Sequence, residues 1–304
     1  MDYLITFFRI RRFSFIILLA LLMTIVASVP VTAQQTFQDE DPYRTESFTL
    51  SEGGALNVQT SGGHITVKGA EGNNLRVEMY VHKNGRMLSP ADTDLSEWEI
   101  EISQSGQQVK AIAKRNNSGW NLFGGSNQQS ISFVIYAPRK INTELSTSGG
   151  HISIQKLVGN QQLKTSGGHL NISQVKGTVD ASTSGGHINV DGSSGELMLK
   201  TSGGHITLAD VGGVIEAKTS GGNISADLNT IDEHAKLKTS GGNIAITIPE
   251  NTGLDLDLKG SYVNASLDNF SGTTDRNEVE GELNGGGPGL SAKTSGGVVT
   301  LSFK

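Results

Sequence analysis

Residues 165–182 read Thr-Ser-Gly-Gly-His-Leu-Asn-Ile-Ser-Gln-Val-Lys-Gly-Thr-Val-Asp-Ala-Ser, and their opening tetrapeptide recurs along the chain. Thr-Ser-Gly-Gly begins at Thr60, Thr147, Thr165, Thr183, Thr201, Thr219, Thr239 and Thr294. Between Thr147 and Thr219 the copies follow one another at intervals of 18 residues, and the next interval is 20 residues. A fixed period of this length indicates a repeat architecture in which each unit stacks on its neighbours.

Each repeat also carries apolar residues in two alternating pairs. With the first Thr counted as position 1, the apolar positions are 6, 8, 15 and 17, as in Leu170, Ile172, Val179 and Ala181. Alternation at period two predicts two short strands, each with one buried face. Glycines at positions 3, 4 and 13 mark the two turns, where we expect tight turns with positive φ.

Strands this short cannot bury their apolar faces alone, so successive repeats must stack. We therefore predict an all-β fold, a parallel β-solenoid with about 18 residues and two short strands per coil. The coils should lie about 4.7–4.9 Å apart and pair in register through parallel hydrogen bonds.

We expect residues 48–304 to form a single solenoid domain, with regular coils over residues 147–304. Residues 48–146 are less regular and should form wider or broken coils that cap the N-terminal end of the stack. Longer strands are expected at residues 75–81, 98–102, 109–113 and 131–136, with a hairpin turn at residues 104–107. A degenerate copy of the repeat begins at Lys259, and residues 279–304 return to the repeat and finish in a final strand.

Residues 1–33 are typical of a signal peptide. Arg9, Arg11 and Arg12 precede an apolar run, and Val31-Thr32-Ala33 places small residues before a cleavage point at Gln34. We expect residues 34–47 to form a flexible leader and the mature protein to reach the periplasm, the cell surface or the medium. The alternative is an uncleaved membrane anchor, because the apolar run is nearly long enough to span. After cleavage we expect no stable membrane span.

Composition excludes several classes of function. Cysteine is absent, so the chain has no disulfide, no thiolate metal site and no cysteine nucleophile. The formal net charge is −6, and removal of residues 1–33 takes away three Arg and one Asp. A net negative charge disfavours nucleic acid as a partner.

A histidine column is the most conspicuous candidate site. His151, His169, His187 and His205 occupy position 5 of successive repeats. His64 belongs to the earlier copy, and Asn223 and Asn243 take the same position later. Parity directs these side chains outward, where stacked imidazoles could bind Zn²⁺ or Cu²⁺. The alternative is a side-chain ladder that bonds between coils. The change to Asn favours the ladder, so we assign no metal site and no cofactor.

The threonine column at position 1 has inward parity. We expect its hydroxyls to bond to the backbone of the turn, because an unpaired buried polar group would be costly. This orientation argues against an ice-binding face, the alternative that a regular threonine array suggests.

A lysine column lies at position 18 and points outward: Lys164, Lys200, Lys218, Lys238 and Lys259. A row of like charges is unfavourable unless it is offset. We expect Asp180, Glu216 and Asp257 to offset it. The column is either a solvated face or a contact for an acidic glycan or another partner.

Residues 115–129 form the one long polar loop, which contains Trp120 and Phe123. Exposed aromatics of this kind can stack on a sugar or a protein partner. The interpretation that we favour is that they fold over the end of the stack as a cap.

The carboxylates near the turns do not form a catalytic pair. They lie at differing positions of the repeat: Asp191, Asp210, Asp227 and Glu233. A polysaccharide-cleaving β-helix would need two carboxylates placed for acid and base roles. We therefore predict no enzymatic activity and no catalytic residues, with polysaccharide cleavage as the less favoured alternative.

Three motifs together resemble a bacterial family named "putative adhesins". They are the recurrent Thr-Ser-Gly-Gly-His/Asn-Ile, the segment Val134-Ile135-Tyr136-Ala137-Pro138 and the tail Gly285-Gly286-Gly287-Pro288. The resemblance covers residues 48–304. It implies an exported β-strand-repeat protein, a β-solenoid at the cell envelope and no catalytic residues. Family members often carry Asp after the glycines, so the histidine column departs from the family pattern.

The sequence therefore predicts a non-enzymatic envelope or surface protein that binds, adheres or acts as a scaffold. Its partner is an unknown glycan or protein of the envelope or surface. The structural alternative is self-assembly, in which the stacks associate end to end through unpaired terminal coils.

Overall fold

A computed structural model describes residues 41–116 and 129–304. The expected signal peptide, residues 1–33, lies outside the described residues, as does the first half of the leader, residues 34–40. Residues Pro42–Lys304 form one compact unit. Its first strand, β1, begins at Arg44 and so occupies the end of the segment that we expected to be a flexible leader. No helix in the described part of the chain is both long enough and apolar enough to cross a membrane.

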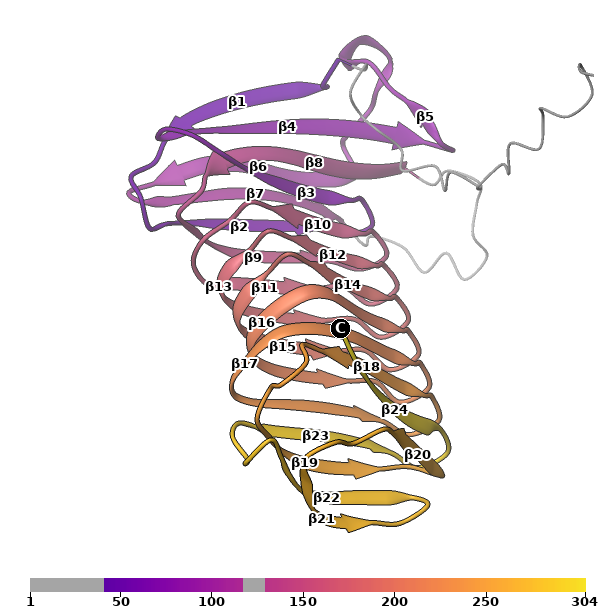
Figure 1. Cartoon of the computed structure of the whole chain (residues 1–304). Helices are drawn as coiled ribbons and strands as arrows, with labels where there is room; N and C mark the ends of the chain where they lie inside the picture. The colour runs from indigo at the N-terminus through magenta and orange to yellow at the C-terminus, as the bar shows by residue number, and fades with distance from the viewer. Residues whose placement is uncertain (1–40, 117–128) are drawn as a thin grey trace, which may run out of the picture. The chain divides into compact units, whose positions relative to one another are not determined.

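The chain is all-β, as predicted. Over the described ranges the single helical element is the 3-10 turn Pro90–Asp92. Every strand of these ranges belongs to one hydrogen-bonded sheet, which Figure 1 shows as a series of stacked coils.

The N-terminal region mixes antiparallel and parallel pairing. Its strands are β1 (Arg44–Thr49), β2 (Gly54–Thr60), β3 (Ile65–Ala70), β4 (Asn74–Lys83), β5 (Arg86–Met87), β6 (Trp98–Ser105), β7 (Gln108–Arg115), β8 (Gln129–Pro138) and β9 (Ile141–Thr147). The predicted hairpin is confirmed, because β6 and β7 pair antiparallel around Gly106, whose φ is +57°. Strands β1, β4 and β8 also pair antiparallel, and β8 then joins β3 in parallel. The regular repeat is therefore preceded by a non-repeating region in which antiparallel and parallel strand pairs are mixed.

The regular region alternates between two layers. Its strands are β10 (Ile152–Gln155), β11 (Gln161–Lys164), β12 (Leu170–Ser173), β13 (Lys176–Ser182), β14 (Ile188–Asp191), β15 (Ser194–Lys200), β16 (Ile206–Lys218), β17 (Ile224–Thr239) and β18 (Ile244–Ile248). We call the layer of β3, β10, β12, β14 and β18 the histidine layer, and the layer of β9, β11, β13 and β15 the lysine layer. Strands β16 and β17 run through both layers.

Pairing within each layer is parallel and in register. In the histidine layer, Ile152 pairs with Leu170, Leu170 with Ile188, and Ile188 with Ile206. In the lysine layer, Val179 pairs with Leu197. Side chains of equivalent repeat positions therefore form columns across the strands.

The core lies between the two layers. Apolar residues at positions 6, 8, 15 and 17 are buried, and the intervening residues face outward, as the alternation predicted. Gln161 is the polar exception at position 15, with a relative exposure of 2%. Its amide accepts a hydrogen bond from the Thr143 hydroxyl at 2.7 Å and donates to the Ile141 carbonyl at 2.8 Å. These bonds offset the cost of burying the amide.

The C-terminal coil does not follow the sequence order that we expected. After β19 (Leu254–Lys259) and β20 (Tyr262–Ala265), the chain forms the hairpin of β21 (Phe270–Thr274) and β22 (Glu278–Leu283). It then returns, so that β23 (Gly289–Thr294) lies between β17 and β19. Strand β24 (Val298–Phe303) lies between β18 and β20. The last coil in sequence is thus inserted before the coil of Lys259.

The glycines of the Thr-Ser-Gly-Gly turn are required for a different reason than predicted. Positive φ occurs at position 13, for example +120° at Gly177, but the glycines at positions 3 and 4 do not show it. A Cβ on Gly186, at position 4, would lie 1.8 Å from the Gly168 carbonyl oxygen of the preceding coil. A Cβ on Gly185, at position 3, would have no neighbour closer than 3.8 Å. Close approach of successive coils therefore explains the second glycine.

This difference predicts opposite effects for two adjacent substitutions. Gly186→Ala should destabilise the protein by about 3 kcal/mol, because the coils must separate to admit the methyl group. Gly185→Ala should leave the stability unchanged or raise it by up to about 1 kcal/mol, because it only restricts the unfolded chain. Urea unfolding followed by circular dichroism measures both. Equal losses in the two variants would contradict the close-approach explanation.

Candidate functional site

The threonine hydroxyls connect successive coils inside the turn. Thr165 donates a hydrogen bond to the Gly150 carbonyl of the preceding coil at 3.0 Å and accepts one from the Gly168 N–H at 3.2 Å. The pattern repeats from coil to coil, and these threonines are at most 7% exposed. The inward orientation is confirmed, and the hydroxyls are not available to form an ice-binding face.

The histidine column lies on the other side of the same turn and forms a ladder. The backbone N–H of His169 donates to Nδ1 of His151 at 2.8 Å, and the N–H of His187 donates to Nδ1 of His169 at the same distance. The ladder begins at His64 and continues to His205, with ring centroids 4.7–5.0 Å apart. The prediction of a side-chain ladder that bonds between coils is confirmed.

Asparagine continues the ladder with an amide oxygen in place of the ring nitrogen. The N–H of Asn223 donates to Nδ1 of His205, and the N–H of Asn243 donates to Oδ1 of Asn223, both at 2.8 Å. The N–H of Val298 in the inserted coil then donates to Oδ1 of Asn243 at 2.9 Å. Histidine and asparagine therefore have the same role in the ladder, because each side chain accepts one backbone N–H from the next coil.

This role determines the protonation state of the rings. A ring nitrogen that accepts a backbone N–H cannot carry a proton, so the bonding network assigns the neutral tautomer with the proton on Nε2. The pKa of His169 is lowered from 6.5, first by burial and then by the neighbouring His151. The pKa values of His64 and His187 are lowered by the same kinds of cause, with burial first.

The ladder does not gather its imidazoles around one point. Zinc lies about 2.0–2.1 Å from each histidine nitrogen, so two nitrogens that share one ion are about 4 Å apart at most. Here the rings are parallel, with centroids nearly 5 Å apart, and each Nδ1 from His64 to His205 already accepts a hydrogen bond. Among residues 41–116 and 129–304, no three His, Asp or Glu side chains are placed to hold a metal ion.

The lysine column is longer and more continuous than the sequence indicated. Lys200, Lys218 and Lys238 pair in register across neighbouring strands. The inserted coil then adds Lys293, which pairs with Lys238 on one side and Lys259 on the other. Sequence analysis missed Lys293 because its place in the column depends on the return of the chain. Lys164 is separated from this run by Ser182.

The carboxylates around this column form different pairs from those expected. Glu216 pairs with Lys236 at 3.2 Å, and its pKa is lowered chiefly by the hydrogen bond from Lys236. Asp257 pairs with Lys293 at 2.6 Å, whereas Lys259 pairs with Glu278 at 3.0 Å. Asp180 makes no ion pair within the described ranges, and neither do Lys164, Lys200, Lys218 and Lys238. The ion pairs that would offset these lysines are therefore absent from the described ranges.

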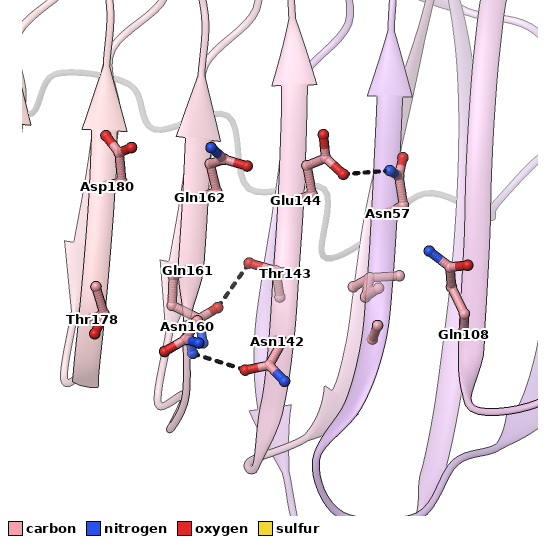
Figure 2. Close-up of a pocket in the computed structure, with 12 residues that line it drawn as sticks. Asn57, Gln108, Asn142, Thr143, Glu144, Asn160, Gln161, Gln162, Thr178 and Asp180 are labelled. Atoms are coloured by element: carbon pink, nitrogen blue, oxygen red, sulfur yellow. Dashed lines mark hydrogen bonds between the residues drawn. The ribbon is translucent and has the colours of Figure 1, made fainter.

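A groove of about 360 Å³, lined mainly by polar residues, crosses β2, β7 and the lysine-layer strands β9, β11 and β13; we call it the polar groove. Figure 2 shows Asp180, Gln162, Glu144 and Asn57 in one row across neighbouring strands. Glu144 accepts a hydrogen bond from the Asn57 amide at 2.8 Å. The row offers amide donors and carboxylate acceptors that suit a polar ligand, and sequence analysis did not single it out, because its residue types differ from coil to coil.

A second hollow of about 440 Å³ lies over β17, β19, β22 and β23 and is mainly acidic. Four carboxylates line it, opposite His234 and Lys236: Asp255, Asp257, Glu280 and Glu282. This group was not predicted from the sequence, although its acids are spaced two residues apart within each of two segments, 255–257 and 280–282. Two of the carboxylates near the turns, Asp210 and Asp227, share one polar network. Lys304 pairs with Asp227 and donates to Asn229, whose amide donates to Asp210.

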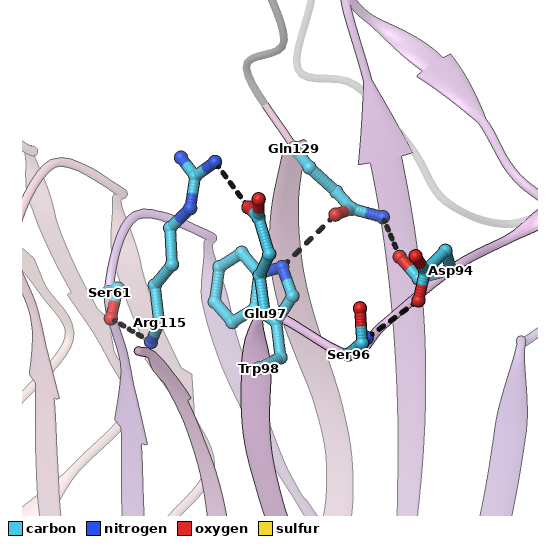
Figure 3. Close-up of polar contacts among 7 residues, drawn as sticks. All are labelled: Ser61, Asp94, Ser96, Glu97, Trp98, Arg115 and Gln129. Atoms are coloured by element: carbon cyan, nitrogen blue, oxygen red, sulfur yellow. Dashed lines mark hydrogen bonds and ion pairs between the residues drawn. The ribbon is translucent and has the colours of Figure 1, made fainter. Parts of the chain in front are cut away.

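Trp120 and Phe123 lie outside the described residues, but the two ends of their loop are well anchored (Figure 3). The Trp98 side chain is 7% exposed, and its indole N–H donates to Oε1 of Gln129 at 3.1 Å. Arg115 pairs with Glu97 at 2.8 Å, and its backbone N–H donates to the Ser61 hydroxyl at 3.0 Å. The loop therefore leaves and returns beside the buried Trp98.

Comparison with known proteins gives one family match. The family model described as Toastrack DUF4097 matches residues 26–302. No curated protein matches the chain. A putative adhesin from Bacteroides fragilis is similar in structure, with 12% identity and a TM-score of 0.42; the match covers 86% of this chain and 96% of that one. A putative cell adhesion protein from Clostridium sporogenes has 11% identity and a TM-score of 0.28, with coverage of 86% and 99%.

The ladder predicts that stability falls as the solution becomes acidic. Well above pH 6.5, His64, His169 and His187 are neutral in both the folded and the unfolded chain. Because folding lowers the pKa of His64, His169 and His187, the unfolded chain binds protons first as the pH falls below 6.5. The free energy of unfolding should therefore decrease from pH 6.5 down to the folded pKa values and then stop responding to these groups.

The measurement is the urea midpoint between pH 7.5 and pH 4.5 for the natural chain and for a variant with His169→Asn and His187→Asn. Asn keeps the acceptor and does not titrate, so the variant should match the natural chain at pH 7.5 and lose part of the acid sensitivity. An unchanged slope between pH 6.5 and pH 5 in the variant would contradict the role of the ladder.

Proposed function

Because the chain belongs to the Toastrack DUF4097 family, we propose that it is a non-enzymatic binding protein of the cell envelope or cell surface. Residues 1–33 would direct its export, and the mature chain would present its surface columns to a partner. The proposal includes a β-solenoid in which each regular coil takes about 18 residues and two strands. The 18-residue offset between hydrogen-bonded partners of neighbouring coils supports this coil size.

The lysine column is the observation that carries the proposal. Lys200, Lys218, Lys238, Lys293 and Lys259 occupy one outward register on five neighbouring strands. Neighbouring strands are about 4.8 Å apart, so the ammonium groups can follow a line across the strands. The first three have no carboxylate partner in the described ranges, which leaves their charge available to a ligand.

An extended acidic glycan fits this line better than a compact ligand. A polymer with a carboxylate on successive sugars repeats its charge along one direction, as the column does. The contacts would be exposed and individually weak, so affinity would come from their number. The chain as a whole is negative, so attraction must be local to the column and should be screened by salt.

Catalysis is disfavoured by the geometry of the polar groove. Glu144 and Asp180 are separated by the strand of Gln162, which places their Cα atoms about 9–10 Å apart. Retaining glycosidases hold their carboxyl groups about 5 Å apart and inverting ones about 6.5–9.5 Å apart. The Cα separation does not fix the distance between the two carboxyl groups. Catalysis is disfavoured because the groove is open and Glu144 already accepts a hydrogen bond from Asn57.

The test uses polygalacturonate as the acidic polymer and dextran as the neutral one, with binding measured by biolayer interferometry at 50 mM salt. The variant Lys200→Gln, Lys218→Gln, Lys238→Gln should bind polygalacturonate about tenfold more weakly. Three exposed contacts at about 0.5 kcal/mol each give this factor. Dextran should not bind, and salt at 500 mM should remove the difference between the natural chain and the variant.

The matched control is Lys114→Gln, Lys156→Gln, Lys176→Gln, which removes the same charge from exposed positions outside the column. This variant should retain the affinity of the natural chain. Equal weakening in both variants would indicate general electrostatic attraction and would sink the assignment to the column. Release of reducing ends from the polymer would instead indicate an enzyme.

Self-association is the second candidate, and the open strand edges favour it. Within the described ranges β1, β6, β20 and β21 each pair with a strand on one side only. Open edges of this kind can template pairing with another chain. End-to-end association would raise the mass measured by static light scattering steadily with concentration. A constant monomer mass up to about 10 mg/ml would exclude it.

A further inference from the structure

The C-terminal coil occupies a slot that the rest of the chain forms around it. Strand β23 has β17 on one side and β19 on the other, and β24 has β18 and β20. In sequence, β23 and β24 follow β19, β20 and the hairpin of β21 and β22. Residues 289–304 therefore enter between coils that precede them in sequence.

The four strands that border the slot, β17, β18, β19 and β20, all form backbone hydrogen bonds with the inserted segment. In the lysine layer, Ala235 and Leu256 both pair with Leu290, which is fully buried. In the histidine layer, Ile244 and Val263 both pair with Val299, which is also fully buried. Without the segment, β17, β18, β19 and β20 would each lose a partner strand and the core would open to water.

The slot is selective for a coil of this repeat. The Thr294 hydroxyl donates to the Gly242 carbonyl at 2.8 Å, which is the same bond that joins the regular coils. A Cβ at Gly297 would lie 1.9 Å from that carbonyl, so glycine is required there. The Val298 N–H donates to Oδ1 of Asn243, which extends the ladder. A segment that fits the slot must therefore carry the threonine and glycine of the turn, flanked on each side by a pair of alternating apolar residues.

The connection to the segment is a short glycine hinge. Residues 284–287 are Asn-Gly-Gly-Gly and all have positive φ, from +52° at Asn284 to +158° at Gly287. Pro288 follows and favours an extended backbone at the residue before it. The closed hinge is thus a tight reversal made of residues that can also adopt an open, extended form.

From this topology we propose that residues 289–304 are an exchangeable element, and that the slot accepts the same residues from a second copy of the chain. Every bond that β23 and β24 make to β17, β18, β19 and β20 is available in identical form in another molecule. The closed monomer and the exchanged dimer then differ mainly at residues 284–288. Because the exchange is reciprocal, it closes at two chains with twofold symmetry.

Exchange is distinct from end-to-end stacking. Stacking through β1, β6, β20 and β21 is head to tail and has no natural limit, whereas reciprocal exchange stops at a dimer. Exchange also requires the hinge to open, whereas stacking leaves the segment in place. A covalent lock between the segment and its slot should therefore abolish exchange and leave stacking unchanged.

Full-length chains with introduced cysteines test the proposal, because the natural chain has none. Ala245 in β18 and Thr300 in β24 pair in register. Neighbouring strands place such residues about 5 Å apart, within the range that a disulfide spans. One chain carries Ala245→Cys and the other Thr300→Cys; the two are unfolded together, refolded and oxidised. A disulfide-linked heterodimer whose share rises with chain concentration is expected on non-reducing gels.

Two further samples complete the experiment. Ala245→Cys refolded with Thr207→Cys, an outward residue of β16 that β17 and β18 separate from the slot, measures random crosslinking. A single chain with both Ala245→Cys and Thr300→Cys should close within itself and remain monomeric, which verifies the register. Heterodimer no more abundant than in the Thr207→Cys mixture would overturn the proposal. Failure of the double variant to close would overturn the register on which it rests.

Discussion

The hydrogen bond from a threonine hydroxyl to the glycine carbonyl of the preceding coil is the constraint on which this structure depends. The Thr165 hydroxyl donates to the Gly150 carbonyl and also accepts the N–H of Gly168 in its own turn. One side chain therefore fixes both the conformation of its turn and the distance from that turn to the turn of the preceding coil. The bond requires glycine at position 4, because the carbonyl lies where a Cβ would be. The threonine hydrogen bond therefore requires the close approach of the two coils, and glycine at position 4 permits that approach.

The spacing set by this bond determines what the surface can do. Every outward position becomes a column with about 4.8 Å between neighbours, which brings like groups together. Imidazoles tolerate this spacing because they remain neutral and accept a backbone N–H, as His169 does. Lysines tolerate it because long side chains can diverge and stay hydrated. A repeat of this kind thus presents linear arrays, which suit a partner that is itself linear and repetitive.

The parts of this fold that depend on one coil and its neighbour could be predicted from the sequence. Alternation identified the buried residues, and parity placed threonine inside and histidine outside. The insertion of residues 289–304 could not be predicted from the sequence. The repeat residues are compatible with stacking on any coil, so the position of this coil depends on how the rest of the chain is arranged. Lys293 and its ion pair with Asp257 could not be predicted for the same reason, and the pair of Lys259 with Glu278 depends on the antiparallel return of β22 to β19. The polar groove was missed because it has no periodic signal.

A stack of identical coils can add further coils at either end. The insertion of residues 289–304 explains how the C-terminal end of this stack is terminated. If the last coil closed the stack, its regular strands would expose complementary edges to any other copy. Instead the coil with the full repeat pattern lies inside, and the outermost strands are the non-repeating hairpin of β21 and β22 and the four-residue strand β20. At the opposite end, the outermost strands β1 and β6 are antiparallel to their neighbours, and β6 carries charged side chains such as Glu99 and Glu101. The most regular coil in the C-terminal region is therefore the one best protected from other molecules, and it can meet them only when the hinge opens.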